Sequence, residues 1–246
     1  NMPVVAAVLQ ARMTSTRLPG KSLYPLAGVS LIEHIINRIK SVTDIDHIVL
    51  AVPDLPSETN LIETAQRLNV AIVKGPEEDV LKRFLMAADH VKAKHIVRIC
   101  GDNPLVDRQL MRSLIHSHLK KNTDYTITSD PIPLGTGSEV AKVDALKKIA
   151  TITKEPKYRE HVTTWFHDHP TTHIQPNVPA PAYLVNKPYR LTVDTESDLS
   201  LMEKIFQQFC TTTSPLPDLA KVIGFLDTHP DIAKINAHIQ QKNWRS

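Results

Sequence analysis

The sequence predicts an α/β fold with a mainly parallel sheet that carries helices on both faces. The first observation is alternation: short runs rich in Val and Ile alternate with amphipathic segments of about 10 to 15 residues, the pattern of βαβ units. The second is that these runs are apolar at almost every position, as strands buried on both faces require. Both observations together predict a three-layer αβα architecture.

The predicted elements follow in chain order. Apolar runs predict strands at 4–9, 46–52, 70–73, 95–99, 124–129 and 138–143, with weaker strands at 173–176, 183–185 and 190–193. Apolar residues at helical spacing predict helices at 30–40, 61–68, 80–92, 107–120, from 145 onward, and at 158–168, 199–209, 219–226 and 231–240. No repeat or linker interrupts this series. We therefore expect one domain over 1–246, with 211–246 as a C-terminal helical extension.

Composition restricts the class of protein. Hydrophobic residues make up 41% and charged residues 22% of the 246 residues, a globular balance, and no apolar run is long enough for membrane insertion. Two cysteines cannot form a disulfide framework and indicate a reducing compartment, so we expect a cytoplasmic protein. The net charge is only +3, and no basic run interleaved with aromatic residues occurs. Nucleic acid is therefore not an expected partner.

Residues 9–21 carry the clearest chemical signal. The loop after the first strand contains Arg12, Arg17 and Lys21, while no acidic residue occurs before Glu33. Cations without a local counter-charge, at the carboxyl end of a buried strand, are suited to binding a polyanion such as a nucleotide phosphate. A solvated turn with chance basic residues is the alternative.

The same loop is not a P-loop. The segment Gly20-Lys21-Ser22 matches the end of that motif, but Ser15 occupies the position of its first glycine. A P-loop lysine begins a helix, and Pro25 would interrupt one. With the P-loop excluded, the sequence predicts an extended phosphate-binding loop that contains several cations.

Isolated carboxylates follow two later strands. Asp102 comes directly after the strand at 95–99, and Asp194 after the strand predicted at 190–193. Carboxylates at a sheet edge suit Mg²⁺ bound to phosphates. The alternative is helix or turn capping, which fits Asp198 better than Asp194. Cys100 is expected to be a small buried hydrophobe, and the sequence His167-Asp168-His169 is expected to place its histidines on the surface.

The sequence of residues 9–21, LQARMTSTRLPGK, resembles the signature of the nucleotide-sugar cytidylyltransferases, which include the CMP-Kdo and CMP-sialic acid synthetases. Further blocks at 75–83, 98–107, 159–163 and 190–198 resemble this family in the same order. The chain has Gln10-Ala11-Arg12 where the sugar-acid synthetases carry Pro-Ala-Arg. It is therefore most similar to the branch of SpsF-like spore-coat polysaccharide proteins.

The resemblance implies a GT-A-like, Rossmann-related fold, CTP as the donor, Mg²⁺ as the cofactor and a homodimer. It implies that four residues are catalytic, namely Arg12, Lys21, Asp102 and Asp194, with both aspartates as Mg²⁺ ligands. It assigns nucleotide binding to Leu9, Gln10, Ala11, Arg12, Ser15, Arg17, Lys21, Gly75, Arg83, Arg98 and Asp102. It assigns contacts with the acceptor, or with a dimer partner, to Glu139, Arg159, Glu160 and His161.

The implied reaction is attack by a hydroxyl of a sugar acid or a related surface-polysaccharide precursor on the α-phosphorus of CTP, with release of pyrophosphate. A glycosyltransferase on the same fold is one alternative. It is disfavoured because Asn103-Pro104 follow Asp102, so the expected Asp-x-Asp motif is missing. A non-catalytic nucleotide-binding protein is the other alternative, disfavoured by the intact cations and carboxylates.

Overall fold

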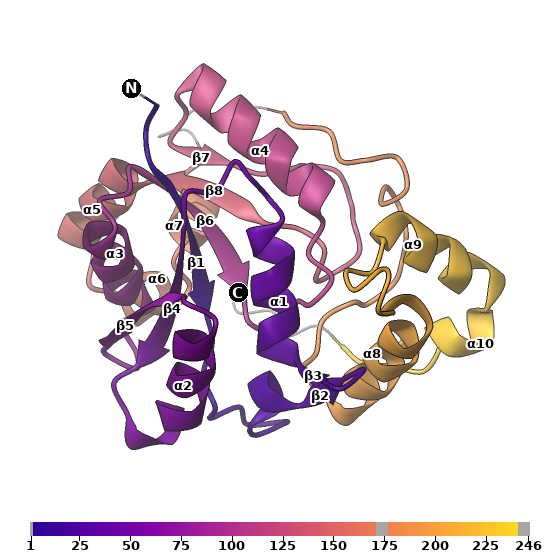
Figure 1. Cartoon of the computed structure of the whole chain (residues 1–246). Coiled ribbons are helices and arrows are strands. Elements are labelled where there is room, and N and C mark those ends of the chain that lie inside the picture. The colour runs from indigo at the N-terminus through magenta and orange to yellow at the C-terminus, as the bar shows by residue number, and fades with distance from the viewer. Residues whose placement is uncertain (1, 171–176, 241–246) are drawn as a thin grey trace.

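The computed structural model describes residues 2–170 and 177–240, and a six-stranded sheet forms its centre (Figure 1). The strand order is β5-β4-β1-β6-β8-β7, and the first four of these strands run parallel, whereas β8 is antiparallel to β6 and β7. The strands are β1 (Val5–Gln10), β4 (His47–Pro53), β5 (Ala71–Gly75), β6 (His95–Cys100), β7 (Tyr125–Thr126) and β8 (Glu139–Lys142). The mainly parallel sheet predicted from the sequence is confirmed.

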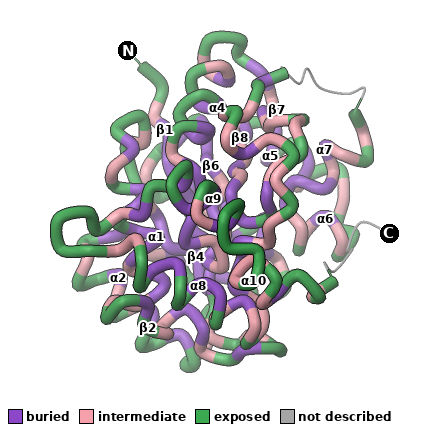
Figure 2. Tube along the Cα trace, turned by 90° about the vertical axis from the view of Figure 1, so that its right-hand side faces the viewer, coloured by how far each residue is buried: buried purple, intermediate pink, exposed green. Residues whose placement is uncertain are grey.

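Helices cover both faces of the sheet, which confirms the three layers (Figure 1). One face packs against α1 (Leu31–Lys40), α2 (Thr59–Arg67), α4 (Arg108–Lys121), α8 (Glu196–Phe209) and α9 (Leu219–Thr228). The other packs against α3 (Val80–His90), α5 (Val143–Ile152) and α7 (Thr164–Asp168). Figure 2 shows that buried positions concentrate along the central strands.

The residues of β1 show how the sheet is buried on both of its faces. Its residues alternate between the two hydrophobic clusters, with Val5, Ala7 and Leu9 on one face and Ala6 and Val8 on the other, and each is at most 1% exposed. A strand buried on both faces has no polar side, which is why its sequence is continuously apolar.

Four short elements lie outside the central sheet and the α-helices that cover it. Residues 21–26 form a 3₁₀ turn (Lys21–Leu23) and the strand β2 (Pro25–Leu26), which pairs with β3 (Val29–Ser30) in a small hairpin. A second 3₁₀ turn (Pro56–Glu58) precedes α2. Pro25 thus ends the turn at Lys21 and begins a strand, as its incompatibility with a helix interior requires.

Several predicted elements are wrong in extent or type. The strand at 183–185 is a turn, because Asn186 has a φ of 60° and Leu184 donates its backbone N–H to Pro181. The strand at 190–193 is reduced to one bridge between Leu134 and Arg190. The strand at 124–129 is only Tyr125–Thr126, since its partner β8 is itself short. The strand at 173–176 lies outside the described residues.

Two predicted helices are also shorter than expected. The helix at 158–168 is split into α6 (Pro156–Glu160) and α7, because the backbone leaves the helical region at His161, with φ −107° and ψ 72°. The helix at 231–240 is only α10 (Pro230–Ala233). The chain then turns and buries Asn236, whose side chain bonds to the loop before α8. No helix within 2–170 and 177–240 has both the length and the apolar character needed to cross a membrane.

A buried histidine pair supports the edge of the sheet. His118 of α4 is fully buried, with its ring nitrogens 2.9 Å from His95 Nδ1 and 2.8 Å from Thr126 Oγ1. Burial, and to a smaller extent His95 and Lys142, lowers the pKa of His118 from 6.5 to about 3. The native state therefore holds His118 neutral at pH values where the unfolded chain would bind a proton.

We expect this pair to make the protein acid-sensitive. Between pH 6.5 and about 4 the unfolded state binds more protons at His118, so the free energy of unfolding should decrease as pH falls, by up to about 1.4 kcal/mol per pH unit from this group. Urea denaturation over this range measures it. The variant His118→Asn should flatten the dependence, whereas the exposed His116→Gln on the same helix should not. An unchanged slope in His118→Asn would contradict this assignment.

Candidate active site

The site lies where β1 separates two neighbouring strands. β1 pairs with β4 on one side and β6 on the other, so the loop that follows it sits at the point where the strand order reverses. In open parallel sheets ligands bind at this point, beyond the carboxyl ends of the strands. The predicted cationic loop follows β1, and Asp102 lies two residues after the last residue of β6. The fold therefore brings two of the predicted signals to one edge.

The loop after β1 is closed by its own backbone. Gly20 has a φ of 73°, a left-handed conformation that glycine tolerates, and its N–H donates to the carbonyl of Met13 at 2.8 Å. The Met13 N–H in turn donates to both carboxylate oxygens of the buried Glu58, at 3.0 and 3.2 Å. The Ser15 hydroxyl accepts from Leu18 N within the loop. These bonds hold the loop in place above the sheet.

Lys21 brings the two predicted carboxylates together. Its side chain is only 7% exposed, and its Nζ lies 2.8 Å from Asp102 Oδ1 and 3.6 Å from Asp194 Oδ1. Arg17 Nη1 lies 3.1 Å from Asp194 Oδ2. Lys21 and Arg17, which have no acidic residue near them in the sequence, thus form ion pairs with acidic residues from distant parts of the chain. Arg12 is exposed, and the described residues offer it no ion pair.

The donor set fits a divalent metal ion. Asp102 and Asp194 already converge on one positive centre, Lys21 Nζ, and both carboxylates keep about one third of their side-chain surface exposed. Asp102 and Asp194 are therefore the candidate protein ligands, and within residues 2–170 and 177–240 no group of three or more His, Cys, Asp or Glu residues converges. Mg²⁺ characteristically takes one or two carboxylates and fills its remaining positions with phosphate oxygens and water.

A buried network holds the backbone of Asp194. Asp198 is fully buried, and its Oδ2 accepts from the N–H groups of Asp194 and Thr195 at 3.0 Å. Thr195 completes the capping box of α8, as expected for this segment. Arg190 binds both oxygens of Asp198 at 2.8 and 2.9 Å, and Asn236 Nδ2 donates to Asp198 Oδ1 and to the Arg190 carbonyl. Burial alone would raise the pKa of Asp198, but these donors lower it.

Gly101 allows β1 and β6 to end close together. Its N–H donates to the Gln10 carbonyl at 2.8 Å, and a Cβ at this position would lie 2.7 Å from Ala11 Cβ and 2.9 Å from the Gln10 oxygen. Because these contacts are to the last residue of β1 and to the residue after it, any side chain at residue 101 must displace the start of the cationic loop.

We expect Gly101→Ala to destabilise the protein by about 1–3 kcal/mol and to raise the KM for nucleotide, because the clash moves the loop. Thermal unfolding and saturation kinetics measure these effects. Gly224→Ala is the matched control. It adds a Cβ into open space on the exposed face of α9 and should stabilise by about 0.5–1 kcal/mol. Equal stability of the two variants would contradict the close approach of residue 101 to Gln10 and Ala11.

A cavity of about 510 Å³ opens beside the two aspartates. It lies beyond β6 and β8, and its lining includes Arg98, Cys100, Asp102, Asn103, Ile127, Thr128, Asp130, Ile132, Pro133, Leu134, Gly135, Gly137, Ser138, Glu139, His167, Arg190, Thr192 and Asp194. Its volume is in the range of sites for small molecules. Asp102 and Asp194 thus line the cavity and also form ion pairs with the cationic loop.

Glu139 is the centre of a polar network in this cavity. It faces Arg98 across the β6–β8 ladder, and Arg98 Nη1 lies 3.3 Å from its Oε2. Tyr125 and Thr163 donate hydroxyls to it at 2.5 and 2.8 Å, and His167 Nε2 is 4.0 Å from Oε1. Burial alone would raise the pKa of Glu139, but His167, Arg98 and the two hydroxyls lower it to about 2. Glu139 is therefore an acceptor with a fixed charge.

Cys100 lines the same cavity but is not activated. Burial, followed by the charge of Asp102, raises the pKa of its thiol to about 12. A thiol in this state carries no thiolate at neutral pH and is a poor nucleophile. The expectation of an inert Cys100 agrees with this, although the residue is partly exposed rather than buried.

Several other predicted site residues lie elsewhere. Arg83 is 1% exposed and donates to the carbonyls of Pro76 and Glu77, so it shapes the loop that follows β5. Gly75 is packed against Arg83, where a Cβ would lie 2.9 Å from its Cγ. Arg159 binds Asp79, the N-cap of α3, through two nitrogens. Of the four predicted acceptor residues, Glu139 lines the cavity, whereas Arg159, Glu160 and His161 do not.

Reasoning from sequence missed part of the cavity. His167 is no solvent-facing surface residue, since its Nε2 lies 3.0 Å from the Tyr125 hydroxyl, and that expectation is wrong. Asp130 and Ser138 also line the cavity, and no sequence signal marks them as site residues, because they come from loops that converge only in the folded chain. Arg190 lies in the block 190–198 that resembles the family, but the sequence assigns it no role in the site.

A cation-rich loop at the strand-order reversal, facing two carboxylates beside a cavity, is the arrangement of a nucleotidyltransferase. The chain matches the family model described as cytidylyltransferase over residues 6–214. The chain therefore belongs to the cytidylyltransferase family.

Several known proteins are similar to this chain in sequence. An uncharacterised protein of Methanocaldococcus jannaschii is 34% identical over 98% of both chains. The spore coat polysaccharide biosynthesis protein SpsF of Bacillus subtilis is 34% identical over 92% of this chain and 95% of its own length. A 3-deoxy-manno-octulosonate cytidylyltransferase of Rhizobium etli is 32% identical over 47% of this chain and 46% of its own.

Two solved structures share the fold. A cytidylyltransferase from Leptospira borgpetersenii superposes with a TM-score of 0.86 at 23% identity, over 97% of this chain and 99% of the other. The CMP-2-keto-3-deoxy-manno-octonic acid synthetase in complex with CTP superposes with a TM-score of 0.60 at 16% identity, over 83% of this chain and 99% of the other.

Proposed function

We propose that this protein transfers CMP from CTP to a hydroxyl of a sugar acid or a related surface-polysaccharide precursor and releases pyrophosphate. The observation that carries the proposal is the convergence of Asp102 and Asp194 on Lys21, beside the loop after β1. The names of its relatives support the choice of substrate class, since they include a polysaccharide biosynthesis protein and cytidylyltransferases for a sugar acid.

Different residues of the chain bind the nucleotide donor and the acceptor. Main-chain atoms near Leu9 and Ala11 hold the cytidine, while Arg12 and Arg17 bind the triphosphate. Lys21 stabilises charge that develops on the departing pyrophosphate. Asp102 and Asp194 would hold Mg²⁺, which would supply a Lewis acid at the phosphates. The acceptor occupies the cavity next to them, which places its hydroxyl beside the nucleotide.

A pyrophosphate-release screen tests the proposal. Purified protein is incubated with each of the four nucleoside triphosphates, Mg²⁺ and a panel of sugar acids, amino sugars and neutral sugars, with EDTA as the control. Release that needs CTP, an acceptor and the metal ion is expected. Transfer of a sugar from a nucleotide-sugar without pyrophosphate release would instead identify a glycosyltransferase, and calorimetric binding of CTP without turnover a nucleotide-binding protein.

A further inference from the structure

The ammonium group of Lys21 lies between the two carboxylates that are the candidate ligands of a divalent ion. Its Nζ is 2.8 Å from Asp102 Oδ1 and 3.6 Å from Asp194 Oδ1, so one cation already faces an oxygen of each aspartate. Two cations held this close together repel each other strongly. A metal ion that binds the same two oxygens must therefore displace the ammonium group.

The second oxygen of Asp194 also faces cations. Arg17 Nη1 lies 3.1 Å from Asp194 Oδ2, and Arg190 Nη2 lies 3.9 Å from the same atom. Arg190 binds both oxygens of the buried Asp198, so its charge is already matched within the loop before α8. Arg17 has no such second partner among the described residues, and its charge is matched by Asp194.

The four charges at this point therefore balance. Lys21 and Arg17 supply two positive charges, and Asp102 and Asp194 supply two negative charges. A divalent ion that enters alone adds two positive charges to a neutral cluster, so it gains little attraction. A triphosphate brings the negative charge that lets both the loop cations and a metal ion be accommodated.

Lys21 is built to exchange partners through its side chain. Its backbone is fixed, because its N–H donates to the Leu18 carbonyl at 3.3 Å and its carbonyl accepts from Tyr24 N at 3.0 Å. Its flexible four-carbon stem lets the ammonium group turn while the backbone stays in place. Both aspartates keep about one third of their side-chain surface exposed, so an entering ion can reach them.

We propose that Lys21 is an internal counter-ion that competes with the metal ion for Asp102 and Asp194 until a nucleotide binds. In the proposed function, on which this inference rests, the cationic loop binds the triphosphate. The phosphate oxygens then attract Lys21 and Arg17 away from the aspartates, and the two carboxylates become available to the divalent ion. Metal and nucleotide binding are thereby coupled, and each favours the other.

Binding of Mn²⁺ alone tests the competition. The full chain is titrated with Mn²⁺ without nucleotide, and the unbound ion is measured by electron paramagnetic resonance. Lys21→Met keeps an unbranched side chain of similar length and removes its charge, so we expect it to bind Mn²⁺ at least tenfold more tightly than the wild type. Arg17→Met should tighten binding by a smaller factor, because Arg17 pairs with only one aspartate and its side chain is 44% exposed.

Equal or weaker Mn²⁺ binding by Lys21→Met overturns the proposal. Should that variant fail to fold, Arg17→Met decides by the same criterion, because its exposed side chain can be replaced without opening the protein interior. In the double variant Lys21→Met/Asp102→Asn the tighter binding should disappear. Its persistence would place the ion elsewhere and would likewise overturn the proposal.

Arg12→Met is the matched control. It removes the same charge from the same loop, but among the described residues Arg12 forms no ion pair with either aspartate. Its Mn²⁺ affinity should differ from that of the wild type less than threefold. Tightening as large as that of Lys21→Met would reveal a general effect of net charge and would contradict a specific role for Lys21.

Nucleotide binding without metal tests the exchange of partners. Isothermal calorimetry in EDTA uses a CTP analogue that has a methylene bridge between the α- and β-phosphates. Lys21→Met should bind this analogue at least tenfold more weakly than the wild type. Its two affinities then change in opposite directions, which a general structural defect does not produce. An unchanged affinity for the analogue would contradict the movement of Lys21 to the phosphates.

The two proposals fail separately. If Lys21→Met binds Mn²⁺ more tightly but the wild type never releases pyrophosphate, the proposed transfer of CMP fails while the competition stands. If pyrophosphate is released but Lys21→Met binds Mn²⁺ no more tightly than the wild type, the transfer stands and the competition fails.

Discussion

Asp102→Asn and Lys21→Ala are each expected to lower kcat by about 100- to 1,000-fold, the usual loss when one group that stabilises transition-state charge is removed. Asp102→Asn keeps the shape of the side chain but removes the negative charge that suits a divalent ion. Lys21→Ala removes the ammonium group that lies between Asp102 and Asp194. Steady-state release of pyrophosphate over a range of CTP and Mg²⁺ concentrations measures both losses.

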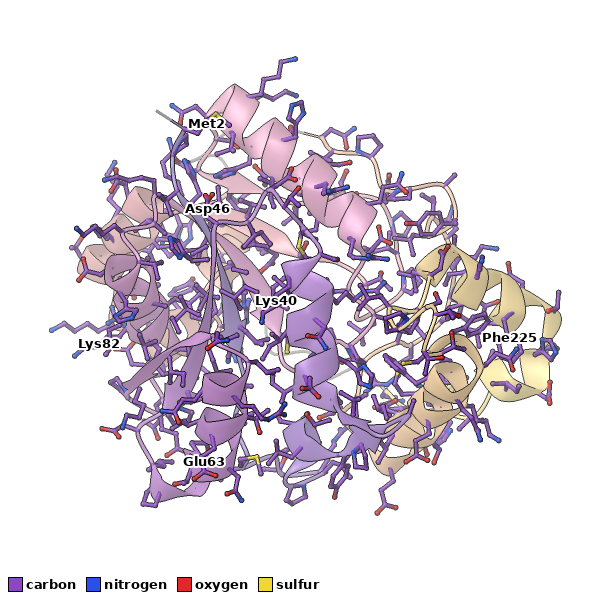
Figure 3. All side chains as sticks on the ribbon, viewed as in Figure 1. Met2, Lys40, Asp46, Glu63, Lys82 and Phe225 are labelled. Atoms are coloured by element: carbon purple, nitrogen blue, oxygen red, sulfur yellow. The ribbon has the colours of Figure 1, made fainter. Side chains whose placement is uncertain are left out.

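The two variants should differ in a second parameter. Asp102→Asn should also raise the Mg²⁺ concentration needed for half-maximal rate, whereas Lys21→Ala should also raise the KM for CTP, because the proposed function assigns Lys21 to the phosphates. Lys82→Ala is the matched control, since Lys82 is exposed on the outer side of α3 (Figure 3). Both aspartates stay about one third exposed, so loss of Lys21 leaves them hydrated and folding should be retained. Turnover near the wild-type rate by either variant would contradict the assignment of this residue to the active site.

Asp198→Ala is expected to reduce the free energy of unfolding by about 3–5 kcal/mol. Asp198 is fully buried and pairs with Arg190, whose side chain is 9% exposed, so the substitution leaves a buried guanidinium group without that partner. It also removes the acceptor for the N–H groups of Asp194 and Thr195. Urea denaturation followed by circular dichroism measures the change.

Asn236→Ala should produce a milder form of the same defect, about 1–3 kcal/mol, because it removes two hydrogen bonds from the same network. At temperatures where this variant is folded, it should still need more Mg²⁺ for half-maximal rate, since Asp194 loses its support. The exposed His238→Ala, two residues away, is the control for a general effect on the C-terminal segment. A variant Asn236→Ala with unchanged stability and unchanged Mg²⁺ dependence would show that this segment does not support Asp194.

The C-terminal segment contacts elements that lie much earlier in the chain. Asn236 lies in the region predicted as a C-terminal helical extension, yet its side chain bonds to the loop that carries Asp194. In the same way, α9 contributes Leu219, Val222 and Leu226 to the hydrophobic cluster that contains α1 and α8. The C-terminal segment therefore supports the site through direct contacts.

The sequence by itself determined the central strands and the cationic loop. β1 and β4 were predictable because burial on both faces requires a nearly continuous apolar run, which is a local property of the chain. β6 was predictable from Ile96, Val97 and Ile99, although Arg98 interrupts its apolar run. The loop at 10–21 was predictable because its charges are dense and the nearest acid comes only at Glu33. The end of each strand could also be read from the polar residues that follow it. These signals sufficed for the fold class, the family and the edge of the sheet that carries the site.

Only the tertiary structure decided which charges meet. Lys21, Asp102 and Asp194 are far apart in sequence, and their pairing depends on the order β4-β1-β6 and on the loop before α8. The cavity depends on the antiparallel β8, which sets Glu139 opposite Arg98. The failed strands at 183–185 and 190–193 have the same cause. Leu184, Leu191 and Val193 are buried, but the backbone groups of these segments bond to loops instead of a neighbouring strand. A short apolar run does not determine where its backbone hydrogen bonds will form.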